Sequence, residues 1–246
     1  MRFSALLMGP LALAVIILGY LSFIESHTEL SVWMIPPALL LAVVFIFRPQ
    51  INMWWWKRNP PRLSPELRGL LYKSLPQLRS LTPDQLERFD LRMSLYLRSS
   101  EFTKPGVTDV PEDVHAAILA PWIYLSLDQD KPYYENYQRI VLYKHPFLSP
   151  AHPDTVHSAE QNAEDGVMIF SNEQLVPGLL DPETQLHLPA YLAAQAYLLT
   201  HQMPSDTKEH YSKARSVDDY SAVLGLPVDE QALQLHHALI YGSDQP

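Results

Sequence analysis

Two apolar runs near the N-terminus constrain the fold more than any other part of the chain. They cover residues 6–23 and 30–47, and neither contains a charged residue. An α-helix needs roughly 20 apolar residues to cross the hydrocarbon core of a bilayer. We therefore expect residues 1–50 to form a hairpin of two transmembrane helices. A cleaved signal peptide is disfavoured because no small-residue cleavage site follows the first run.

The second run leaves an alternative open. Pro36 and Pro37 lie within it, and each proline removes a backbone hydrogen-bond donor. Proline is tolerated in membrane helices where neighbouring groups satisfy the freed carbonyls. The alternative to a second span is a re-entrant or surface-lying segment behind a single anchor.

Basic residues beside the two runs predict the orientation of the hairpin. Arg2 precedes the first run, Arg48 and Arg62 follow the second, and the loop at residues 25–29 has no Lys or Arg. Basic flanks stay on the cytoplasmic side. We expect a multi-pass protein of the bacterial inner (cytoplasmic) membrane, with both termini in the cytoplasm.

Residues 51–66 read as a juxtamembrane linker rich in Trp, basic residues and Pro. Tryptophan rings suit the headgroup layer, and Lys and Arg suit anionic lipid. The alternative is that the tryptophans pack on the soluble domain or on a partner. The predicted membrane-interface residues are Trp54, Trp55, Trp56, Lys57 and Arg58.

The composition excludes several kinds of site. The 246 residues include no Cys, so the chain has no disulfide, thiolate nucleophile or Cys-based metal site. A net charge of −9 disfavours nucleic acid as a partner, because such binding depends on neutralising phosphates. With only 8 Gly and no glycine-rich phosphate motif, a nucleotide site is not expected either.

The order of helical and strand patterns in residues 67–246 predicts one α+β domain, mainly helical with a small sheet. Thr82, Pro83 and Gln85 form the clearest helix start, as N-cap, first-turn proline and capping-box partner. The expected helices cover 67–75, a segment from residue 83, an apolar segment from residue 112, and 181–202. The expected strands cover 139–143 and 167–170, with a loop or ragged hairpin at 152–165.

This order of elements resembles the MtfA-like zinc peptidases, a gluzincin-type family. The resemblance rests on the Leu-Thr-x-x-Gln helix, the strand Ile-Val-Leu-Tyr-Lys-His-Pro-Phe and the strand Gly-Val-Met-Ile-Phe-Ser. It covers roughly residues 75 to 225 and implies a zincin-like fold. Relatives carry His-Glu-x-x-His on the long helix after the second strand, where two His bind zinc and the Glu is the general base.

No His-Glu-x-x-His occurs in this chain. On the alignment that the resemblance implies, Tyr191 and Gln195 replace the two His, Leu192 replaces the Glu, and Asp219 aligns with a downstream acidic ligand. Leu has no proton acceptor, and a neutral Gln amide is a poor zinc ligand. The resemblance therefore predicts a degenerate member of the family that has no metal and no other cofactor.

From this we expect a membrane-anchored protein that is not an enzyme and acts by binding protein partners, in regulation or scaffolding. One alternative is an accessory or assembly subunit of a larger membrane complex, and another is an unconventional membrane metallohydrolase. An acidic and aromatic stretch containing Tyr133, Tyr134 and Tyr137 is the candidate partner surface. An ordinary solvated loop is the competing interpretation of that stretch.

Overall fold

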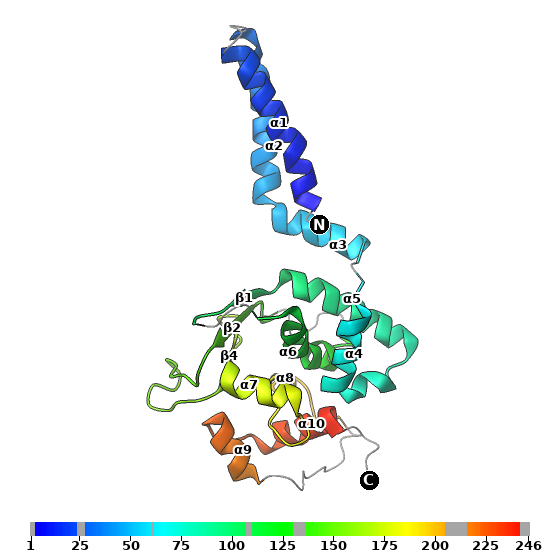
Figure 1. Ribbon diagram of the computed structural model, residues 1–246, viewed down its shortest axis with the longest axis vertical. Helices are drawn as coiled ribbons and strands as arrows, with labels where there is room; N and C mark the ends of the chain where they lie inside the picture. Colours follow the sequence, from blue (N-terminus) through cyan, green and yellow to red (C-terminus); the bar gives the residue numbers. More distant parts are fainter. Residues whose placement is uncertain are drawn as a thin grey trace. The chain divides into compact units, whose positions relative to one another are not determined.

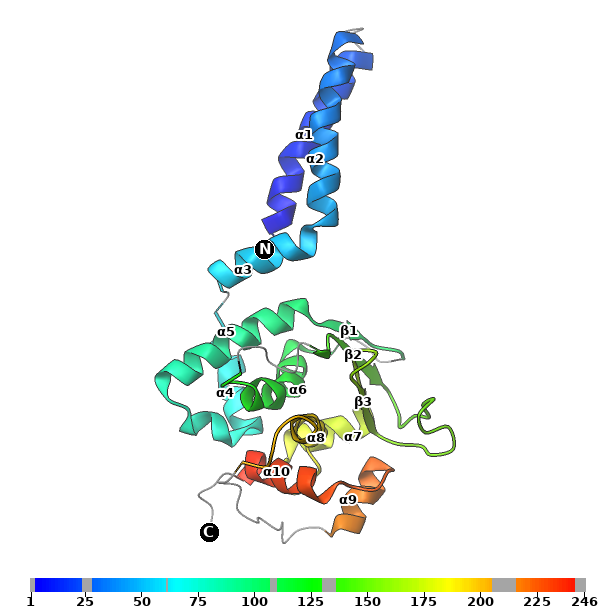
Figure 2. The same ribbon diagram turned by 180° about the vertical axis from the view of Figure 1, so that it is seen from behind.

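The chain folds into two compact units, Met1–Pro61 and Arg62–Pro246 (Figures 1 and 2). The computed structural model describes residues 3–23, 28–60, 62–106, 110–129, 136–204 and 216–241. The boundary between the units falls within the proline-containing linker, where each proline fixes φ and few contacts cross.

The N-terminal unit begins with α1 (Phe3–Phe23). Within α1, the segment Phe3–Ser22 is long and apolar enough to cross a membrane, and only 6% of it is buried inside the protein. At 1.5 Å per residue its 20 residues reach about 30 Å, the thickness of a bilayer core. One N-terminal helix is therefore suited to spanning a membrane.

The second apolar run forms a composite of two shorter helices. It contains η1 (Thr28–Met34, a 3₁₀-helix) and α2 (Ile35–Ile46). Together they extend about 32 Å, whereas α2 alone reaches only about 18 Å. The proline pair occupies the first turn of α2, where a missing N–H costs little. The two prolines therefore mark the start of α2 and do not interrupt a helix within the second run.

The unit ends with α3 (Arg48–Arg58), whose axis bends by 70° from the preceding helical segment. α3 also contacts the beginning of α1, because the Phe3 and Trp55 rings stack with centroids 4.2 Å apart.

The second unit contains eight further helical segments among the described residues. They are α4 (Pro65–Ser74), η2 (Pro76–Ser80), α5 (Pro83–Ser99), α6 (Glu112–Leu125), α7 (Asn172–Leu180), α8 (Leu188–Leu198), α9 (Val217–Leu224) and α10 (Glu230–Tyr241). The predicted capping box of α5 is present, with Thr82 and Gln85 satisfying each other's backbone N–H groups. The apolar segment predicted from residue 112 is α6, which continues through Pro121 to Leu125.

The sheet is small and mixed, with strand order β1–β2–β4–β3. Its strands are β1 (Glu101–Thr103), β2 (Arg139–Tyr143), β3 (Ala159–Asn162) and β4 (Val167–Ser171). β2 runs parallel to both β1 and β4, and β3 runs antiparallel to β4. The α+β prediction is confirmed, and the ragged hairpin is the β3–β4 pair. β1 was not predicted because three residues carry too little periodicity.

The predicted helix 181–202 is wrong in its start. Asp181 is the C-cap of α7, and α8 begins only at Leu188, with His187 as its N-cap. Pro189 lies in the first turn of α8, where a proline is well tolerated. The connection between the two helices folds back onto α7, where a Cβ built on Gly178 would lie 2.2 Å from Leu186 O.

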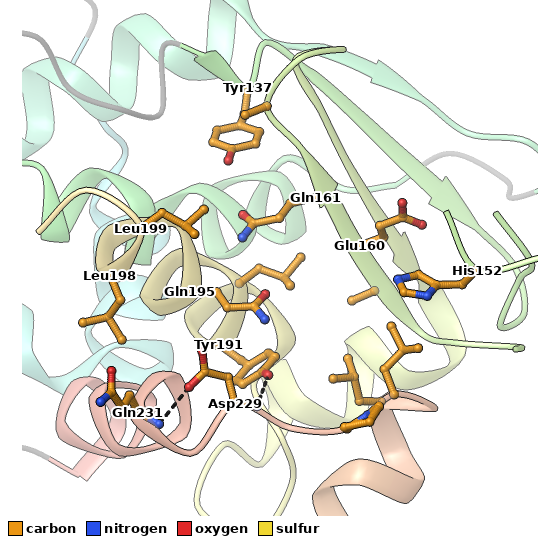
Figure 3. A pocket seen from close by; sticks show the side chains of 16 residues that line it. Tyr137, His152, Glu160, Gln161, Tyr191, Gln195, Leu198, Leu199, Asp229 and Gln231 are labelled. Atoms are coloured by element: carbon orange, nitrogen blue, oxygen red, sulfur yellow. Dashed lines mark hydrogen bonds between the residues drawn. The ribbon is translucent and has the colours of Figure 1, made fainter. Parts of the chain in front are cut away.

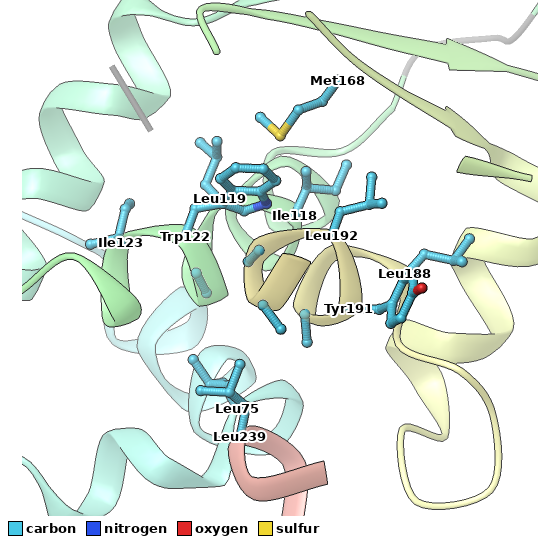
Figure 4. Close-up of a cluster of buried hydrophobic side chains, with 14 of the residues drawn as sticks. Leu75, Ile118, Leu119, Trp122, Ile123, Met168, Leu188, Tyr191, Leu192 and Leu239 are labelled. Atoms are coloured by element: carbon cyan, nitrogen blue, oxygen red, sulfur yellow. The ribbon is translucent and has the colours of Figure 1, made fainter. Parts of the chain in front are cut away.

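α8 is the central element of the core. It packs between α6 and α10, and most of its residues are buried. Figure 4 shows Leu192 of α8 beside the side chains of Ile118 and Trp122 on α6. Because neighbours surround α8 on several sides, few of its residues are left to line a surface cavity.

Candidate functional site

A cleft of about 430 Å³ lies beside α8 in the second unit (Figure 3). Three segments form its walls: edge strand β3, one face of α8, and residues 224–231, which connect α9 to α10. Polar and apolar side chains alternate in it. The side chains used in the argument below are Tyr191, Gln195, Glu160, Gln161 and Asp229.

Strand β3 is the outer strand of the sheet. It pairs with β4, and among the described strands no other pairs with its far edge. Ala159, Glu160 and Gln161 of β3 also line the cleft. An edge strand presents backbone N–H and C=O groups that can pair with another extended chain.

Tyr191 connects α8 to α10. It is 0% exposed, and its hydroxyl oxygen accepts a hydrogen bond of 2.9 Å from the backbone N–H of Asp229. The Asp229 carboxylate in turn accepts from the backbone N–H groups of Gln231 and Ala232, at the start of α10. Burial raises the pKa of Tyr191, with the nearby Asp229 charge adding to the effect. The phenol is thus held neutral as a structural link.

A carboxylate and an imidazole meet at the other wall of the cleft. His157 Nε2 lies 2.9 Å from Glu160 Oε2, and His157 Nδ1 lies 2.9 Å from the carbonyl oxygen of Thr155. Both ring nitrogens of His157 therefore have a hydrogen-bond partner within the protein. The His157 side chain is 0% exposed and that of Glu160 14%. This pairing fixes the orientation of Glu160.

The segment before β3 is fixed by the end of α9. Ser158 donates from its backbone N–H to Leu224 O and from its hydroxyl to Val223 O, at 2.8 and 2.7 Å. Gly225 ends α9 with a φ of +80°, and a Cβ built there would lie 2.2 Å from Val156 O. Only glycine allows this turn to approach the His157 segment so closely.

Two buried histidines hold the beginning of α8. The Ala190 N–H donates to His187 Nδ1 at 3.1 Å, and the His187 N–H donates to His236 Nε2 at 3.2 Å. Burial lowers the pKa of His187 to about 4. Burial also lowers the pKa of His236 well below its usual value, and the neighbouring His237 and His187 add to that effect. Both rings are therefore neutral acceptors at neutral pH.

The structure brings three of the motif-aligned residues together at the cleft and leaves the fourth apart. Tyr191, Leu192 and Gln195 line the cavity from α8. Asp219 is exposed on α9, where its carboxylate accepts from the backbone N–H and hydroxyl of Ser216 in a capping box. This local cap accounts for the acidic residue at that position.

Of the three tyrosines in the candidate partner surface, only Tyr137 lies within the described residues. Tyr137 is 3% exposed, lines the cleft, and packs edge-on against Trp122 with ring centroids 4.8 Å apart. Burial raises the pKa of Tyr137. Tyr133 and Tyr134 lie outside the described residues, so the partner surface predicted around them stays a prediction.

Sequence reasoning missed Glu160 and Asp229 as parts of one cleft, and His157 as the partner of Glu160. His157 and Glu160 lie in the segment expected as a loop or ragged hairpin, and Asp229 lies outside the predicted helices and strands. No short-range pattern connects Glu160 with Asp229, because they are more than 60 residues apart along the chain and meet only when β3 and the segment before α10 pack beside α8.

The residues on α8 do not fit a zinc ion. Tyr191 is buried, hydrogen-bonded and favours its neutral form, Leu192 has no donor atom, and the Gln195 amide is neutral. Across the described residues, no group of three or more His, Asp or Glu side chains is arranged to hold a metal ion. The zinc site of the resembled family is therefore not reproduced by these side chains.

A comparison with protein families matches residues 52–179 to the family described as glucose-regulated metallo-peptidase M90. The match covers just over half of the chain and confirms the family predicted from the sequence. It begins in α3, earlier than expected, and ends before α8. The alignment of residues 191–195 with the zinc motif thus lies outside the matched part. No curated protein and no solved structure matches the chain.

The family match corrects one expectation. The prediction that the protein is not an enzyme is wrong, because the matched family consists of metallopeptidases. That prediction treated the missing motif on one helix as decisive. The side chains of α8 do not fit zinc, but this does not establish inactivity, since other groups with acid–base chemistry line the same cleft.

Proposed function

Since the chain belongs to the glucose-regulated metallopeptidase M90 family, we propose that it is a membrane-anchored member whose cleft binds an extended segment of a protein. The single observation that carries the proposal is the edge of β3 beside the cavity, with which no other described strand pairs. A peptide laid along this edge adds a strand to the sheet, and its side chains enter the cleft.

The size and chemistry of the cleft support a peptide ligand. The four residues of β3 extend about 14 Å, enough for roughly four residues of an extended peptide. Amide side chains at Gln161, Gln195 and Gln231 can both donate to and accept from peptide groups. Leu198 and Leu199 add apolar surface for a hydrophobic side chain. Glu160 supplies an oriented carboxylate on the same wall.

Membrane attachment is supported by the N-terminal unit. α1 has the length and composition of a span, and η1 with α2 reaches a similar length. The contact between Phe3 and Trp55 places both ends of the hairpin together, which suits two spans with a short connecting loop. We propose that both spans cross the inner membrane and that the second unit lies in the cytoplasm. Action as an accessory subunit of a larger complex stays a prediction.

The test uses the full chain purified in mild detergent. Binding and cleavage of an unstructured protein, such as casein, are measured with and without added zinc. We expect saturable binding, and a Gln195→Arg substitution should weaken it at least about tenfold, because the longer side chain fills the cleft and removes an amide that can bind peptide groups. Gln202→Arg is the matched control, because Gln202 is exposed and lies outside the cleft.

Absence of both binding and cleavage would refute the proposed function. Equal loss in the two variants would show that added charge, rather than the cleft, is responsible. Cleavage that depends on zinc would show that the cleft acquires a metal through residues other than those aligned on α8, and would add a reaction to the proposed binding.

A further inference from the structure

α3 stands out within the N-terminal unit because it leaves the direction of the hairpin. It follows α2 after Phe47 and bends by 70° from the preceding helical segment. In Figure 1 it crosses the end of the α1–α2 pair. If the hairpin spans a bilayer, a helix at this angle lies close to the plane of the membrane surface.

Specific contacts fix α3 to the hairpin. Asn52 is only 5% exposed, and its Oδ1 accepts a 2.9 Å hydrogen bond from the backbone N–H of Ser4. This N–H is one of the first groups of α1, which have no partner within their own helix. The Phe3 and Trp55 rings stack beside it, with an interplanar angle of 3°. α3 is therefore held in place by contacts with α1 and forms part of the anchor.

The remainder of α3 presents cations and an exposed indole ring. At about 100° per residue, Trp54 lies about 160° and Lys57 about 140° around the helix from Asn52. Trp54 is 52% exposed, and the Arg58 guanidinium lies 5.2 Å from its ring centroid. Arg48 lies 5.5 Å from the ring centroid of Phe45. Each arginine thus holds its charge beside an aromatic ring at the foot of the hairpin.

Charge separates the two units sharply. Residues 1–61 contain four Lys or Arg and two Glu, which gives this unit a net charge of +2. Since the whole chain has a net charge of −9, residues 62–246 have a net charge of −11. An anionic membrane surface attracts a basic segment and repels an acidic domain. Only the N-terminal unit is therefore complementary to anionic headgroups, and three of its four cations belong to α3.

We propose that α3 lies in the headgroup layer and gathers anionic phospholipid, with Arg48, Lys57 and Arg58 contacting the lipid phosphates and Trp54 inserted beside them. Tryptophan prefers this layer because its ring is apolar and its N–H is polar. The bend sets the angle between α3 and the hairpin, and the Asn52 contact fixes that angle. The cations select lipids with negatively charged headgroups.

The test reconstitutes the full chain in phosphatidylcholine vesicles containing a minority of phosphatidylglycerol. Bromine atoms on the acyl chains of one lipid or the other quench nearby tryptophans. A Trp33→Phe background removes the tryptophan of η1, and Trp122 is buried in the core of the other unit. The measured signal change therefore comes from the three tryptophans of α3.

At equal content of brominated lipid, we expect phosphatidylglycerol to quench at least twofold more than phosphatidylcholine at low salt. A Lys57→Gln/Arg58→Gln variant should lose most of this preference. A Lys73→Gln/Arg79→Gln variant removes one exposed Lys and one exposed Arg from the other unit and should retain it. High salt should reduce the preference in the wild type.

Equal quenching by the two lipids would overturn the proposal, and so would a preference that survives in the Lys57/Arg58 variant. Absence of quenching by either lipid would place α3 outside the membrane surface and overturn it as well. The result does not depend on the cleft, because no peptide or peptidase readout enters the measurement.

Discussion

Lowering the pH should destabilise the second unit through His187 and His236. Each ring accepts a backbone hydrogen bond on one nitrogen, and protonating that nitrogen removes the acceptor. His187 has a folded-state pKa of about 4, against 6.5 in the unfolded chain. Because the folded pKa is the lower one, the unfolded state binds more protons between these two values. The free energy of unfolding therefore has its full value above pH 6.5 and decreases as the pH falls toward 4.

The magnitude follows from the difference between the two pKa values. At ~1.36 kcal/mol per pKa unit, the limiting loss from His187 is about 3.4 kcal/mol. Between pH 7 and pH 5 the same linkage gives a loss of about 2 kcal/mol. His236 shifts in the same direction and adds to this loss. Asp90 acts oppositely, since burial raises its pKa despite the adjacent Arg68, but its contribution cancels when variants are compared.

The assay is urea unfolding of the full chain in mild detergent at several pH values. Trp122 is the only tryptophan of residues 62–246, so replacing the other four with Phe makes its fluorescence report on this unit. The comparison variant is His187→Asn/His236→Gln. Asn is a good N-cap and can replace the Nδ1 acceptor, while Gln can replace the Nε2 acceptor, and neither titrates.

We expect the free energy of unfolding of the double variant to depend less on pH, by at least about 2 kcal/mol between pH 7 and 5. His145→Gln is the control, because it replaces a histidine whose side chain is 65% exposed rather than buried. If the double variant and the wild type lose stability in parallel over this range, the reasoning from buried neutral histidines is refuted.

Three further substitutions test local features of the fold. Gly225→Ala should lower the free energy of unfolding by at least about 2 kcal/mol, because φ is +80° and the new methyl group would meet Val156 O. Gly69→Ala should instead raise it by about 0.5–1 kcal/mol, because Gly69 lies within α4 and a Cβ there meets open space. Thr82→Ala should cost about 1 kcal/mol through loss of the α5 capping box, and an unchanged midpoint of urea unfolding would contradict that role.

Local signals in the sequence predicted those elements whose ends are defined by neighbouring residues. The α5 start was predictable because Thr82, Pro83 and Gln85 act on one another within a single turn. β2 was predictable because its β-branched residues fit a buried strand. In both cases the interactions that determine the element lie within a few residues.

The start of α8 and the composition of the cleft could not be predicted in this way. Asp181 followed by proline is a good local helix start, yet tertiary packing makes Asp181 the end of α7. The actual N-cap, His187, is not a usual capping residue and relies on His236, 49 positions later, for its own N–H. Glu160 and Asp229 likewise line one cleft only because β3, α8 and the segment before α10 pack together, an arrangement that no local pattern encodes.

The packing of α8 limits where chemistry can take place in the cleft. Tyr191 uses its hydroxyl to link α8 with α10, and Leu192 is 2% exposed among core side chains. Of the three residues aligned with the zinc motif, only Gln195 is left to contact a ligand. The groups with acid–base chemistry belong to the other walls, as Glu160 of β3 and Asp229 before α10. Asp229 already caps a helix, so Glu160, oriented by a buried imidazole, is the residue on which a search for peptidase activity should concentrate.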